Sequence, residues 1–118
     1  MDSIRAEVEA AAEAFIDAIA DLRRQLEINE ALVHQALNHF RSGASMARTM
    51  TEVPSAGARA SAQDAVRSFY AGKNRMRVAV TTAALEEGLS VAEIAEVFTI
   101  PHDVVASISA EHPRTEVS

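Results

Sequence analysis

The chain has 118 residues, a length that favours one compact domain, or a small domain with an appended helix. It has no Cys, no Trp, one Tyr and four Phe, which excludes disulfides and thiol chemistry and, with abundant Ala, favours packed helices over a β-sandwich. No apolar run reaches the ~18–20 residues of a membrane span and the N-terminus is acidic, unlike a signal peptide, so we expect a cytoplasmic protein with no membrane partner.

The net charge of -6 is distributed unevenly along the chain. Residues 1–40 carry three basic and eight acidic side chains, residues 41–80 carry seven and two, and residues 81–118 carry one and seven. The basic centre keeps nucleic acid among the candidate partners, because the local distribution of charge matters more for binding than its sum.

From residue 8 to residue 40 the apolar residues follow a heptad, which predicts a helix with one stripe facing a partner helix. We therefore expect residues 1–41 to be a coiled-coil-like dimerisation helix. The stripe consists of two columns of residues, each with a spacing of seven; Ala12 belongs to one column and Ala36 to the other. The side chains expected in the homodimer contact are Val8, Phe15, Ile19, Leu22, Leu26, Val33 and Phe40.

Asn29 occupies a companion position of this heptad. A buried Asn in such a seam can fix the register and the oligomeric state. Asn is also a good helix N-cap. The sequence therefore leaves two alternatives, one continuous helix or two helices that meet near Asn29, and we favour the continuous helix because the period is long.

Residues 42–61 are small and polar, include Pro54 and Gly57, and show no apolar period. This composition predicts a loop or linker. A short helix is an alternative there, because Met46 and Met50 lie at positions i and i+4.

A helical pattern resumes at Ala62. Gly72 offers either an end to this helix or a bend, after which the pattern runs on to Glu87. Gly88 then supplies a C-terminal stop, because Gly readily takes the left-handed conformation that ends a helix.

Residues 88–110 contain two short helical patterns separated by a turn. Ser90 and Glu93 have the spacing of a capping box at the start of the first helix, and Pro101 starts the second with a preset φ. We expect these helices and the one before them to share a core. Its members are Val78, Val80, Ala84, Leu85, Ile94, Ala95, Phe98, Ile100, Ile108 and either Val104 or Val105.

The segment from Arg75 to Ala110 resembles the helix-turn-helix of bacterial repressors, recombinases and sigma-type regulators. The resemblance implies an all-α fold, with a trihelical helix-turn-helix domain at residues 62–112 and a tail at residues 113–118. Many family members carry Gly in the turn where this chain has Thr99, so we expect a slightly different turn here.

The resemblance also implies a DNA-binding transcriptional or nucleoid-type regulator, with its second helix in the major groove of double-stranded DNA. That helix has no outward Arg or Lys, so phosphate contacts have to come from the preceding helix while outward residues contact bases. The residues expected at DNA are Arg67, Lys73, Arg75, Arg77, Ser90, Thr99, His102, Asp103 and Ser107.

A protein-interaction adaptor or structural dimer is the alternative, because a fold does not dictate its function. Its partner would be a protein, and it would bind no DNA.

No catalytic constellation is present in the sequence, so we expect no enzyme, no cofactor and no metal. Glu30 and His34 lie at positions i and i+4, but no second Glu-x-x-His motif completes a di-metal site. No nucleophile elbow accompanies His102, and the isolated Gly residues form no phosphate-binding loop.

Overall fold

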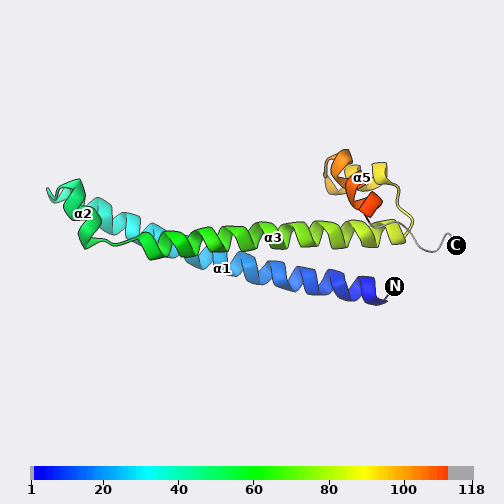
Figure 1. The fold of residues 1–118 in the computed structure, drawn as a ribbon, viewed down its shortest axis with the longest axis horizontal. Helices are drawn as coiled ribbons and strands as arrows, with labels where there is room; N and C mark the ends of the chain where they lie inside the picture. Colours follow the sequence, from blue (N-terminus) through cyan, green and yellow to red (C-terminus); the bar gives the residue numbers. More distant parts are fainter. Residues whose placement is uncertain (1, 112–118) are drawn as a thin grey trace. The chain divides into compact units, whose positions relative to one another are not determined.

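The structure, a computed structural model, describes residues 2–111, and over that range it contains helices and no strand (Figure 1). The helices are α1 (Asp2–Arg41), α2 (Met46–Glu52), α3 (Ala56–Glu86), α4 (Val91–Phe98) and α5 (His102–Glu111). The predictions of an all-α chain and of a long N-terminal helix are confirmed. His112 and the expected tail at residues 113–118 lie outside the described residues.

The described residues divide into two compact units. The first unit contains residues 2–15 and 72–111, and the second unit contains Ile16–Ala71. Helices α1 and α3 contribute to both units, so each unit contains one stretch of each helix.

Helix α1 is uninterrupted, and its more buried positions include a series spaced alternately by four and three residues. We call this series the α1 seam: Ile4, Val8, Ala11, Phe15, Ala18, Leu22, Gln25, Asn29, Leu32, Ala36 and His39. Such spacing is the 3.5-residue period of a helix that packs along another helix. The side chain of Asn29 donates to the carbonyls of Gln25 (2.8 Å) and Ala58 (3.3 Å), so it lies within a continuous helix and does not begin a new one.

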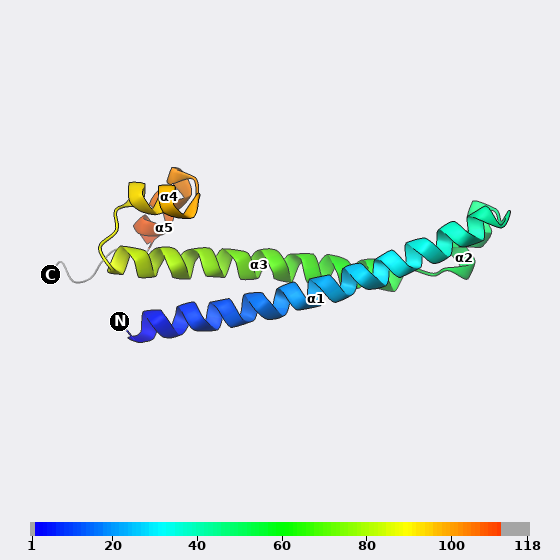
Figure 2. The same ribbon diagram turned by 180° about the vertical axis from the view of Figure 1, so that it is seen from behind.

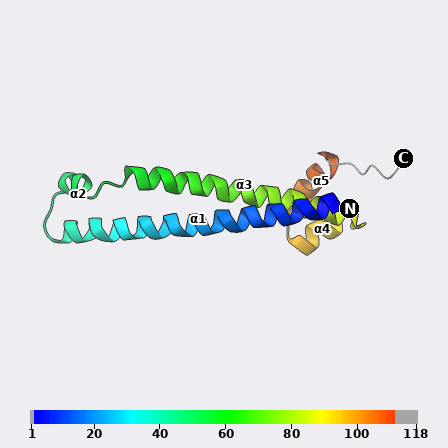
Figure 3. The ribbon, with the colours of Figure 1, turned by 90° about the horizontal axis from the view of Figure 1, so that it is seen from below.

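Helix α3 carries a matching seam composed mainly of small residues, and the two helices lie side by side within each unit (Figures 1 and 3). The α3 seam is Ala58, Ala62, Ala65 and Phe69 in the second unit, and Gly72, Met76 and Ala79 in the first. The small side chains let the backbones approach closely. A Cβ added at Gly72 would lie 3.1 Å from Phe15 Cδ1 and 3.4 Å from Phe15 Cα.

The seams change the interpretation of the heptad. Val8, Phe15 and Leu22, which the sequence analysis assigns to a contact with a second chain, belong to the α1 seam and are half-buried within a single chain. The physical reason is that α3 returns antiparallel to α1, and its Ala and Gly positions leave room for these larger side chains.

Residues 42–61 are not one loop, because they contain α2 and the first turns of α3. Ser45 caps α2 by accepting a hydrogen bond from the N–H of Arg48 (3.1 Å). Glu52 accepts from Arg48 Nε at 2.7 Å and lies 3.1 Å from Nδ1 of His39 on α1. The short helix through Met46 and Met50, which the sequence analysis gave as the alternative to a loop, is therefore the one that forms.

Helix α3 runs through Gly72 to Glu86, so of the two alternatives at Gly72 the helix continues. Gly88 follows the end of the helix with a φ of +100°, and the N–H of Leu89 donates to the carbonyl of Ala84 at 3.0 Å. This six-to-one hydrogen bond around a left-handed residue is a Schellman cap, as expected for Gly88.

In the first unit, α4 and α5 pack against the end of α3, on the side away from the start of α1 (Figure 2). Ile94 of α4 and Val105 of α5 are both 0% exposed, and they meet Ala84 and Leu85 of α3. The predicted capping box is present, because Glu93 N–H donates to Ser90 Oγ (3.1 Å) and Ser90 N–H donates to Glu93 Oε1 (2.9 Å).

Two expectations about this core are wrong. Phe98 is 40% exposed, because Ile100 packs against the core at the end of α4 in its place. Thr99 does not shift the turn to another conformation: it takes φ 53° and ψ 44°, the left-handed values that usually need Gly. The N–H of Ile100 donates to the carbonyl of Ala95 (3.1 Å), so α4 ends with the same six-to-one hydrogen bond as α3.

Candidate functional site

A groove of about 370 Å³ separates α3 from α5 in the first unit. Helix α3 contributes one set of lining residues at i, i+3 and i+4 spacing, namely Asn74, Arg77 and Val78. Helix α5 contributes the other: Asp103, Val104, Ser107 and Ile108. The folded chain therefore brings a guanidinium, an amide, a carboxylate and a hydroxyl to one groove with an apolar floor.

Among the described residues that line this groove, Arg77 is the one with a basic side chain. It is half-buried, and within residues 2–111 it forms no ion pair. Lys73, one helical turn earlier on α3, is exposed and likewise forms no ion pair with a described residue. Both cations are consequently available to an anionic partner without first breaking an ion pair with a described residue.

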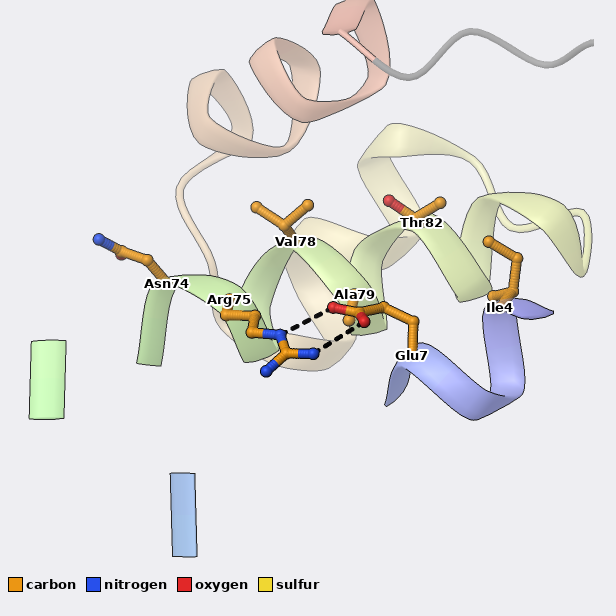
Figure 4. Close-up of a pocket in the computed structure, with 7 residues that line it drawn as sticks. All are labelled: Ile4, Glu7, Asn74, Arg75, Val78, Ala79 and Thr82. Carbon is orange, nitrogen blue, oxygen red and sulfur yellow. Dashed lines mark hydrogen bonds and ion pairs between the residues drawn. The ribbon is translucent and has the colours of Figure 1, made fainter. Parts of the chain in front are cut away.

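Arg75 is engaged elsewhere in the first unit (Figure 4). Its Nε and Nη2 both donate to the carboxylate of Glu7 at 2.9 Å, a bidentate pair between α3 and α1. The hydrogen bond from Arg75 holds the pKa of Glu7 below its usual value. Because a carboxylate already neutralises Arg75, a phosphate has to compete with Glu7 for it.

This ion pair borders an apolar cavity of about 440 Å³ between α1 and α3 (Figure 4). Besides the pair, its lining comprises Ile4, Asn74, Val78, Ala79 and Thr82. Asn74 and Val78 line this cavity as well as the groove, so the two hollows share part of α3.

Arg67 is not part of the groove. It belongs to the second unit, where its Nη1 donates to Asp64 Oδ1 at 2.9 Å and both side chains are exposed. The four predicted phosphate ligands therefore differ in state: Lys73 and Arg77 are unpaired within the described residues, whereas Arg67 and Arg75 each have a carboxylate partner.

The exposed positions of α5 include polar side chains but no Lys or Arg. His102, Asp103 and Ser107 are all exposed, and Asp103 lies in the first turn, where its negative charge favours the helix dipole. The side chain of Ser90 serves as a helix cap and Thr99 forms the turn, so these two residues have structural roles.

Sequence analysis missed Glu7, Asn74 and Val104 as members of this region. Glu7 lies 68 residues before Arg75, and no local pattern connects them. The spacing of Asn74, Arg77 and Val78 was available as a signal, but it requires that α3 continue past Gly72.

No described helix is apolar over a stretch long enough to cross a membrane. Within residues 2–111, no three His, Asp or Glu side chains lie together in a way that could hold a metal ion. Comparison of the chain with protein-family models, with curated proteins and with solved structures found no match.

Proposed function

We propose that this chain is a double-stranded DNA-binding regulator of the helix-turn-helix kind, in which α4 and α5 are the two helices of the motif. The observation that carries the proposal is the groove where Arg77 lies together with Asp103 and Ser107. A cation beside outward polar groups of the second helix is the arrangement that phosphate contact and base contact require together.

The short connection between α4 and α5 also supports this proposal. Thr99 in a left-handed conformation turns the chain directly after α4, and the first turn of α5 begins with His102. The buried pair Ile94 and Val105 holds the two helices against α3. In this assignment the exposed side chains of α5 contact bases, and Lys73 and Arg77 contact the flanking phosphates.

Fluorescence anisotropy with a labelled duplex of about 30 base pairs, titrated between about 50 and 200 mM salt, tests the proposal. Each phosphate contact releases counterions, so the affinity should fall steeply as salt rises. Replacing Arg77 or Lys73 by Ala should weaken binding and lower the salt slope by about one unit per contact.

Arg24→Ala is the matched control, because it removes an equal charge from an exposed Arg in the second unit. Glu7→Gln forms a further arm: it frees Arg75 from its carboxylate partner and should tighten binding at low salt. A folded chain that binds no duplex at about 50 mM salt would refute the proposal. Equal losses for Arg77→Ala and Arg24→Ala would refute the assigned contact surface.

An adaptor that binds a protein is the second candidate, and one observation favours it. Val97 and Phe98 expose apolar surface at the end of α4, close in sequence to an α5 without Lys or Arg. Such a surface suits a protein partner better than phosphate. Binding of a defined protein that survives high salt and is lost in Val97→Ser, with no duplex binding, would establish this alternative.

A further inference from the structure

The second unit exposes an apolar stripe on α1, immediately beside the α1 seam. Each of its positions follows a seam position by one residue: Ile16, Ile19, Arg23, Leu26, Glu30, Val33, Leu37 and Phe40. Leu26, Val33 and Phe40 are 56%, 66% and 51% exposed. Within a single chain these side chains therefore face water, although they repeat with the period of a helix contact.

Helix α3 adds apolar surface to the same side of the second unit. Val66 and Tyr70 follow the seam positions Ala65 and Phe69 by one residue, and both are exposed. The corresponding positions nearer the start of α3 are the exposed polar residues Arg59 and Gln63. In two antiparallel helices with the same hand, the positions one residue past each seam turn towards the same side of the pair. We call this combined surface, the α1 stripe with Val66 and Tyr70, the lateral face.

The ring of Tyr70 on this face contacts the ring of a seam residue. Its centroid lies 5.5 Å from that of Phe69, with the planes at 79°, an edge-to-face contact with a seam residue.

We propose that the lateral face is the contact surface for a second copy of this chain, with the two helical hairpins forming an antiparallel four-helix arrangement. Exposed apolar side chains that gather on one face of a protein mark an interaction surface. A surface made of two helices with a 3.5-residue period is matched in shape by another surface of the same kind. The face lies within residues 16–71, so this interface does not depend on DNA binding by the first unit.

The charges on the stripe favour a second copy of the chain as the partner, and they favour an antiparallel direction for it. Arg23 and Glu30 are the charged residues of the stripe, they lie seven residues apart in one column, and neither forms an ion pair within residues 2–111. An antiparallel copy brings Arg23 near Glu30 of the partner twice, around a symmetry axis near Leu26. A parallel copy would instead align Arg23 with Arg23 and Glu30 with Glu30, which is unfavourable.

Sedimentation equilibrium of the full chain, from about 1 to about 100 µM, tests the interface. The parent chain should be dimeric. Leu26→Glu should raise the dissociation constant by about tenfold or more, because it places a charge on the apolar face. Ile28→Glu is the matched control: Ile28 is also exposed on α1, but it lies about 200° around the helix from Leu26 and should leave the dimer unchanged.

Charge reversal tests the direction. Arg23→Glu alone should weaken the dimer, and the double variant Arg23→Glu with Glu30→Arg should restore it, since the pair is then exchanged. Circular dichroism checks that every variant keeps its helix content. A parent chain that stays monomeric at about 100 µM would overturn the interface, and so would equal losses for Leu26→Glu and Ile28→Glu. Failure of the double variant to restore the dimer would overturn the antiparallel arrangement.

Discussion

Replacing Thr99 by Gly should stabilise the protein, although it removes a side chain. Within residues 2–111, Thr99 is the one residue other than Gly that has a positive φ, at 53°. The left-handed conformation costs a residue with a Cβ about 1–2 kcal/mol. Gly relieves this cost but adds about 0.4–1 kcal/mol of conformational entropy to the unfolded chain. We therefore expect a net gain of about 0.5–1 kcal/mol, or a rise in Tm of about 2–6 °C.

Urea and thermal denaturation followed by circular dichroism measure this gain. Thr99→Asn should also stabilise, because Asn tolerates the left-handed region without the entropy cost of Gly. Thr51→Gly is the control of opposite sign: Thr51 lies in α2 with ordinary helical geometry, so Gly there should destabilise. If Thr99→Gly is less stable than the parent, the left-handed turn is not strained and this reasoning is wrong.

Two further predictions concern the core and the cap of α4. Ile94→Ala should cost about 2–5 kcal/mol in urea denaturation, because Ile94 is fully buried and its removal leaves a cavity; a loss below about 1 kcal/mol would contradict the three-helix core. Hydrogen bonds from Ser90 lower the pKa of Glu93, the backbone N–H contributing most. The ionised form is therefore favoured by folding, and its contribution is present at neutral pH and lost as pH falls through the lowered pKa. The stability advantage of the parent over Glu93→Gln should shrink between about pH 6 and pH 3, and an advantage independent of pH would show that the charge is not involved.

Local signals in the sequence were sufficient for the ends of the helices near the C-terminus. Ser90 with Glu93, Gly88, and Pro101 each act within one turn of the chain, and the structure contains the capping box, the Schellman cap and a helix that follows Pro101. These features depend on hydrogen bonds between residues at most five positions apart, so composition and spacing predict them.

Where the composition of a segment gives no clear signal, the sequence predicts less of its structure. The segment at residues 42–61 has few apolar residues, yet it contains α2, which Ser45 caps and which Glu52 joins to His39 of α1. At Thr99 the identity of the residue predicts an altered turn, but the turn keeps the left-handed conformation that Gly usually takes. Ile100, the next residue, packs against the core and donates its N–H to the carbonyl of Ala95, and these contacts hold the turn.

The candidate site depended most on contacts between distant residues. The sequence predicted Arg77, Asp103 and Ser107 individually, and the groove between α3 and α5 brings them together. The pairing of Arg75 with Glu7 could not be predicted, because it joins residues 68 positions apart and requires the start of α1 to lie beside α3.

By itself, the sequence determined that the chain is helical and that α1 has a 3.5-residue apolar period, because both follow from propensity and spacing along one helix. Only the tertiary structure decided which helix that period faces. An apolar column on a helix does not show whether its partner belongs to the same chain or to another. Here the small residues of α3 pack against one column of α1, and Leu26, Val33 and Phe40 in the neighbouring column stay exposed.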